Sequence, residues 1–147
     1  MLPTPKTVMR VVDTQATAGE TNTSVIDRMG FDYAVINIGF QALEATTAPA
    51  VIKLQESNDT NASNFADVTG FVGGTSFTLP TTIRSLGNTN GPSIVRMGVD
   101  CKARKRYLRT SISVGTHGAV VQNADLYRGD EAPYTAGPAG VDVLVNG

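Results

Sequence analysis

The sequence predicts an all-β protein: an antiparallel β-sandwich of jelly-roll or Greek-key type with extended N- and C-terminal arms. Three observations lead to this prediction. Short runs alternate between apolar and other residues with a period of two, which is typical of strands with one buried face. Turn-forming residues are frequent, with 15 glycines and 7 prolines among 147 residues. No stretch shows the periodicity of a long amphipathic helix.

Two runs in the first half of the chain show the alternation most clearly. Residues 33–40 place an apolar side chain such as Ile36 at every second position, and residues 50–57 do the same around Leu54. We expect these runs to form a central strand pair. Residues 41–49 join them with a connection between hairpin and long-loop length.

Further strands are predicted on both sides of this pair. They span residues 6–12, 24–28, 65–68, 76–79, 93–100, 106–114, 119–128 and 141–145. The total is about eight to ten strands, as expected for a sandwich. Residues 13–23 are predicted to be a loop, since they are rich in Thr, Ala, Gly and Asn. Residues 101–105 are short enough to make the flanking runs an antiparallel hairpin.

The chain is long enough for one domain that buries roughly 68–70% of its unfolded surface. Such a domain needs no metal or disulfide to fold. We divide it into residues 1–12, an N-terminal arm with the first strand, residues 13–128, the sandwich body, and residues 129–147, an extended C-terminal arm. The last strand, residues 141–145, would close its own sheet or reach a neighbouring chain.

Composition excludes several classes of protein. The formal net charge of −1 argues against nucleic-acid binding through global charge. The single cysteine excludes an internal disulfide. The first residues lack the pattern of a signal peptide, and no apolar run approaches the ~20 residues that span a bilayer. We therefore expect a soluble protein made in a cytosol, without a membrane partner.

Few residues offer catalytic or metal-binding chemistry. His117, the only histidine, lies in a turn and no motif places a nucleophile beside it. Cys101 lies beside Lys102, and nearby cations could lower its thiol pKa, although a lone cysteine at a strand end is typically structural. Residues 58–61 and Asp67 offer oxygen ligands, but the glycine and glutamate of an EF-hand loop are missing. We predict no catalytic residue, no metal site, no cofactor and no enzymatic activity.

A basic run is the sharpest feature of the surface. Its four cations form a candidate partner-contact tip: Lys102, Arg104, Lys105 and Arg106. Together with Arg96 and Arg109 they make up half of the chain's 12 lysines and arginines. On a hairpin tip they would project together and attract an anionic surface. An acidic protein surface and a merely solvated tip are both open interpretations. Nucleic acid is less favoured, because Tyr107 is the only aromatic residue interleaved with the run.

Four segments resemble small structural proteins of tailed bacteriophages. Residues 30–39 carry a glycine–strand–glycine pattern, and residues 50–59 contain Leu-Gln-Glu-Ser followed by Asn-Asp. Residues 65–70 read Phe-Ala-Asp-Val-Thr-Gly, and residues 106–115 begin Arg-Tyr-Leu-Arg before a turn. These patterns are strand and turn chemistry rather than a catalytic signature.

The resemblance implies a capsid decoration (cement) protein, located on the virion and made in the host cytoplasm. Such a protein clamps neighbouring major capsid proteins on the mature phage head, and many members of this class are homotrimers. No catalytic residues come with the resemblance. A tail, neck or head-fibre component is the alternative structural role.

A carbohydrate-binding module on a jelly roll is a rival from another class. Sugar sites usually stack the ligand on exposed aromatic rings. The chain has no tryptophan, and its four tyrosines are scattered in sequence: Tyr33, Tyr107, Tyr127 and Tyr134. The sequence therefore favours the capsid role over sugar binding.

Overall fold

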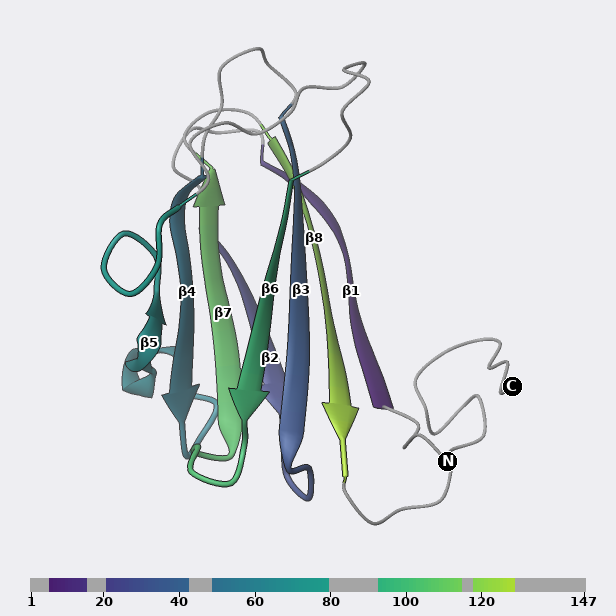
Figure 1. The fold of residues 1–147 in the computed structure, drawn as a ribbon, viewed down its shortest axis with the longest axis vertical. Coiled ribbons are helices and arrows are strands. Elements are labelled where there is room, and N and C mark those ends of the chain that lie inside the picture. Colours follow the sequence, from purple (N-terminus) through teal and green to yellow (C-terminus); the bar gives the residue numbers. More distant parts are fainter. Residues whose placement is uncertain (1–5, 16–20, 43–48, 80–92, 115–117, 129–147) are drawn as a thin grey trace.

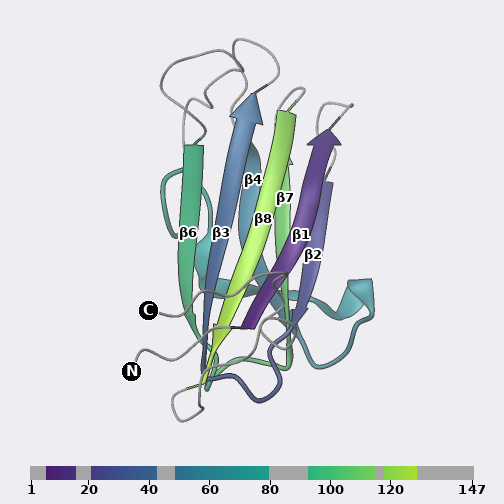
Figure 2. The same cartoon turned by 90° about the vertical axis from the view of Figure 1, so that its right-hand side faces the viewer.

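The computed structural model describes residues 6–15, 21–42, 49–79, 93–114 and 118–128. Two antiparallel four-stranded sheets face each other in this part of the chain (Figures 1 and 2). The predicted β-sandwich is therefore confirmed. The eight strands are β1 (Lys6–Gln15), β2 (Thr21–Asp27), β3 (Tyr33–Ala42), β4 (Pro49–Ser57), β5 (Ala66–Val72), β6 (Ser93–Asp100), β7 (Tyr107–Val114) and β8 (Gly118–Tyr127).

The strand order identifies the topology. Sheet A has the order β1-β8-β3-β6, and sheet B has the order β2-β7-β4-β5. Pairing joins β1 to β8, β2 to β7, β3 to β6 and β4 to β5, so the second half of the chain pairs with the first half in reverse order. This winding is the eight-stranded jelly roll. Of the two topologies that the sequence left open, the structure has the jelly roll.

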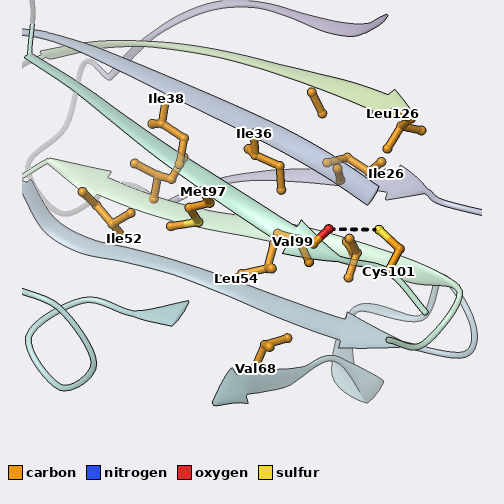
Figure 3. Close-up of a cluster of buried hydrophobic side chains, with 14 of the residues drawn as sticks. Ile26, Ile36, Ile38, Ile52, Leu54, Val68, Met97, Val99, Cys101 and Leu126 are labelled. Atoms are coloured by element: carbon orange, nitrogen blue, oxygen red, sulfur yellow. Dashed lines mark hydrogen bonds between the residues drawn. The ribbon is translucent and has the colours of Figure 1, made fainter. Parts of the chain in front are cut away.

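The core lies between the two sheets and follows from the alternation (Figure 3). Every second side chain of a strand points inward, and the largest of these are fully buried. They are Ile36, Ile38, Ile52, Leu54, Leu108, Ile112, Leu126, Val68 and Val99. Burying one such side chain stabilises the fold by about 1.5–3 kcal/mol relative to leaving it exposed. The two sheets are therefore held together mainly by aliphatic packing.

Both predicted strand pairings are wrong. β3 and β4, the expected central pair, lie in opposite sheets, as do β6 and β7, the expected hairpin. Alternation shows which face of a strand is buried, but both layers of a sandwich offer the same kind of face. A five- or six-residue connection can also span the roughly 10 Å between packed sheets. Strand period and loop length therefore do not specify the partner.

The boundaries around the predicted loop 13–23 also differ. β1 continues to Gln15, and β2 begins at Thr21. A register shift between Arg10 and Asp13 keeps this polar end of β1 paired with β8. Residues 6–12, which the sequence grouped with the N-terminal arm, form most of β1 within sheet A.

Two strands predicted after β4 also differ from the observed ones. β5 extends to Val72, because Gly70 has a φ of +90° and the pairing with β4 changes register there. The predicted strand 76–79 is only an isolated bridge at Phe77, although Phe77 and Leu79 pack on the core. The predicted last strand, residues 141–145, and the rest of the C-terminal arm lie outside the described residues.

Candidate functional site

The predicted basic tip lies on the crossing from sheet A to sheet B. Residues 101–106 connect β6 to β7 at the same end of the sandwich as the β2–β3 turn and the β4–β5 loop (Figure 1). The four cations are therefore on a crossover between layers rather than on a hairpin tip. We call residues 101–106 the basic crossover. Arg96 and Arg109, which were grouped with these cations, lie in opposite sheets.

Arg28, which directly follows β2, holds the basic crossover in place. Its backbone N–H donates to the carbonyl of Arg106 at 3.1 Å. Its side-chain Nε donates to the carbonyl of Lys105 at 2.9 Å, and its Nη2 donates to the carbonyl of Arg104. A planar guanidinium suits two acceptors side by side. This role could not be predicted from the sequence, since the partners of the side chain are 76 and 77 residues away along the chain.

Acidic side chains pair with the two arginines of the crossover. Glu56 accepts a hydrogen bond from the backbone N–H of Lys105 at 3.0 Å, and its carboxylate lies 3.7 Å from Nη1 of Arg104. Asp27 pairs with Arg106 at 2.7 Å. The hydrogen bond from the Arg106 guanidinium holds the pKa of the Asp27 carboxyl below its ordinary value. The charges of both arginines are thus partly neutralised by neighbours.

Unlike those of the two arginines, the side chains of the two lysines of the basic crossover have no acidic partner among the described residues. Lys102 and Lys105 are exposed, and neither side chain forms an ion pair with a described residue. Their backbone is nevertheless fixed, because the N–H of Lys102 donates to Asp100 Oδ1 at 2.9 Å and that of Lys105 donates to Glu56. The end of the sandwich therefore presents two ammonium groups on a fixed backbone.

Cys101 is a buried structural residue rather than a reactive thiol. Its side chain is fully buried and its Sγ donates to the carbonyl of Val99 at 3.7 Å (Figure 3). Burial raises the pKa of the thiol from its ordinary value of 9.0 to about 11. The sequence suggested that nearby cations lower this pKa. That suggestion is wrong, because desolvation outweighs the attraction of Arg28 and Arg104.

The side chains of the polar loop between β4 and β5 form hydrogen bonds with other groups of the same loop. Asp59 accepts hydrogen bonds from the Asn61 N–H at 2.9 Å and from the Asn64 amide at 2.9 Å. The Asn64 bond is the main reason that the pKa of Asp59 is lowered. Asp67 is instead paired with Lys53 and with the Gln55 amide on sheet B. These oxygens do not converge, and within the described ranges no three His, Cys, Asp or Glu side chains are grouped as metal ligands. His117 lies outside those ranges.

The structure brings together two tyrosines that are far apart in sequence. Tyr33 and Tyr127 are register partners on β3 and β8, and their ring centroids lie 6.5 Å apart. Tyr107 belongs to sheet B, and Tyr134 lies outside the described residues. Two of the four tyrosines are therefore neighbours in space. This pair could not be predicted from the sequence, because it depends on β3 and β8 lying side by side.

A small cavity lies between the sheets. It has a volume of about 10 Å³ and is lined by the polar residues Ser24, Thr110, Gln122 and Asn123 together with aliphatic side chains. That volume suits about one water molecule rather than a cofactor or substrate. No described helix is long and apolar enough to span a membrane.

No protein-family model and no curated protein matches the chain. A function must therefore be argued from the fold and the surface.

Proposed function

We propose that the protein is a structural virion protein: a capsid decoration (cement) protein that binds the outer surface of a phage head. There it would stabilise contacts between major capsid proteins. The eight-stranded jelly roll supports this role, because this fold recurs in viral capsid domains, although it also occurs in lectins and cupins. The segments that resemble phage structural proteins overlap β3, β4, β5 and β7, and so belong to the scaffold.

The basic crossover is the observation that carries the proposal. Lys102 and Lys105 present positive charge from a backbone that Arg28, Asp100 and Glu56 hold in place. A pre-organised surface loses little conformational entropy on binding. Positive charge on it favours an acidic patch of the major capsid protein and accelerates association. The protein would act by binding alone, without catalysis, cofactor or nucleic acid.

A homotrimer fits the same role. One trimer engages several capsid subunits at once, so that later contacts become intramolecular and gain avidity. A standard interface of about 1,600 Å² in total is sufficient for each contact. Size-exclusion chromatography with light scattering measures the oligomer, and a monomer would contradict the trimer without excluding capsid binding.

Addition to phage heads tests the proposal. Purified full-length protein is mixed with expanded mature heads of its own phage that lack it, and binding is measured by co-sedimentation. We expect saturable binding and greater resistance of the heads to heat or chaotrope. Heads that bind no protein, or bind it without gaining stability, would end the proposal.

A charge variant tests the contact surface. Replacing both lysines, in Lys102→Ala/Lys105→Ala, should weaken head binding at least tenfold and reduce its salt dependence. Lys53→Ala is the control, since Lys53 lies on β4 and pairs with Asp67. Equal binding by both variants would assign the contact to another surface.

A tail, neck or head-fibre position is the alternative within the same class. Immuno-gold labelling of intact virions separates the two roles by location. Label over the whole head supports decoration, whereas label confined to the tail, neck or fibres supports the alternative.

A further inference from the structure

The outer face of sheet A carries an aromatic ring that lies across two strands (Figure 2 shows this face). Tyr33 begins β3 and is 42% exposed. Its hydroxyl end rests on Gly98 of the neighbouring β6, where the Cβ of any other residue would collide with it. The glycine thus lets the ring extend along the sheet, with one side on the backbone and the other toward solvent.

A second ring and a row of polar groups surround this tyrosine. Tyr127 lies 6.5 Å away at an interplanar angle of 54°. Asp100 is the register partner of Tyr33 on β6, and Asp125 is the partner of Val35, two positions farther along β3. The pKa of Tyr127 is raised, by burial first and then by Asp125.

Two rows from Tyr33, Asn37 pairs in register with Arg96 on one side and Asn123 on the other. Arg96 Nε donates to Asn37 Oδ1 at 2.7 Å, and no bond from its two Nη groups to a described residue is seen. All these positions belong to one face. The rows of Tyr33 and Asn37 are roughly 13 Å apart along the strands, and the outer two of the three strands are roughly 10 Å apart.

The carboxylates of this face keep acceptor capacity. Asp100 Oδ1 accepts from the Lys102 N–H at 2.9 Å, and Asp125 Oδ1 accepts from Thr7 at 2.7 Å. A carboxylate has two oxygens with about four acceptor positions, so each can accept more. The face therefore combines a ring with donors from Arg96 and acceptors from Asp100 and Asp125.

We propose that this tyrosine platform, centred on Tyr33 and Tyr127, binds a neutral saccharide. The C–H face of a pyranose is apolar and stacks on an aromatic ring, while its hydroxyls both donate and accept hydrogen bonds. Two carboxylates beside one guanidinium disfavour an anionic ligand such as a uronate or a nucleotide. Glycan binding goes beyond capsid decoration, because it needs no capsid contact and uses a different surface from the basic crossover.

A glycan array tests the platform with the full-length chain. The array carries neutral hexose oligosaccharides and uronate-containing oligosaccharides, and calorimetric titration follows with a neutral sugar that is retained. Tyr33→Ala should weaken binding at least tenfold, whereas Tyr33→Phe, which keeps the ring, should weaken it less than threefold. Tyr107→Ala, on sheet B, is the control and should bind as the wild type does.

Gly98→Ala provides a second variant, which removes no ligand-facing side chain. Its Cβ would push the Tyr33 ring off the sheet, so we expect binding to weaken at least threefold with the fold retained by circular dichroism. This variant also carries the test if Tyr33→Ala does not fold. Failure to retain any neutral sugar, retention of uronates alone, or full binding by these variants would overturn the proposal.

Discussion

Thr110 and Gln122 form a polar pair between the two sheets. Thr110 on β7 is fully buried, Gln122 on β8 is 8% exposed, and Thr110 Oγ1 donates to Gln122 Oε1 at 2.5 Å. A satisfied hydrogen bond contributes about 1 kcal/mol, whereas a buried group left unpaired costs about 1–3 kcal/mol. The pair therefore favours one alignment of sheet A on sheet B over alternatives that aliphatic packing alone would accept.

Removing one partner should cost more than removing both. Thr110→Val leaves Gln122 Oε1 without its donor, and we expect the free energy of unfolding to fall by about 1–3 kcal/mol. Thr110→Val/Gln122→Leu should recover part of that loss, since no buried oxygen is left unpaired. Urea denaturation measures the double variant and both single variants, Thr110→Val and Gln122→Leu. A double variant that loses the sum of the two single losses would show that the pair is not coupled.

Burial of the Cys101 thiol should make the free energy of unfolding decrease at alkaline pH. Its pKa is about 11 in the folded protein and near 9.0 when exposed, so the folded state holds the thiol proton more tightly. Below pH 9 both states are protonated and the full contribution is present; between pH 9 and about 11 only the unfolded state releases the proton, and stability falls. Denaturation midpoints across this range should therefore decline more steeply for the wild type than for Cys101→Ala. Parallel curves would contradict the assignment.

The turn between β2 and β3 requires a glycine at position 30. Gly30 has a φ of +80°, and a Cβ added there would lie 2.7 Å from Nη2 of Arg128. The Arg128 side chain donates to the Gly30 carbonyl and lies over the Phe31 ring, 4.9 Å from its centroid. The turn thus joins the end of β8 to the start of β3.

Gly30→Ala should destabilise the protein more than Gly74→Ala does. Both residues have positive φ, which costs a non-glycine residue about 1–2 kcal/mol, but a Cβ at Gly74 meets no atom within 4 Å. The difference between their unfolding free energies isolates the contact with Arg128. Thermal and urea unfolding of the two variants measure it. Equal losses would mean that Arg128 moves aside without cost.

The positions of the strands could be predicted from the sequence, but which strands are neighbours could not. β3 and β6 were predicted close to their observed bounds, because Ile36, Val99 and similar residues produce a clear period of two. The end of β1 and the start of β2 were missed, since their residues are polar and show no apolar alternation, although they pair with β8 and β7. The Tyr33–Tyr127 pair and the Arg28 contacts could not be predicted, since each depends on which distant strands lie side by side.

The winding of the whole chain has a consequence for folding. In the jelly roll the first half of the chain forms four strand pairs with the second half. Of these pairs, only β4 with β5 joins consecutive strands. The others enclose progressively longer segments: β3 with β6, β2 with β7 and β1 with β8. Loop-closure entropy favours the shortest loop first, and each pair formed shortens the effective loop for the next. We expect folding to begin around β4 and β5 and to take milliseconds to seconds, as for other proteins dominated by non-local contacts.

Two chemically identical substitutions test this order. Ile52 on β4 and Ile26 on β2 are both buried, 1% and 3% exposed, and Ile→Val at such a site typically costs 0.5–1.5 kcal/mol. If β4 is structured in the transition state, Ile52→Val slows folding and barely changes unfolding; if β2 joins later, Ile26→Val mainly accelerates unfolding. Stopped-flow refolding and unfolding in urea give both rates. The reverse pattern would place the nucleus in β2 and β7, where closing the longer loop would have to be offset by the packing of Ile26 against the core.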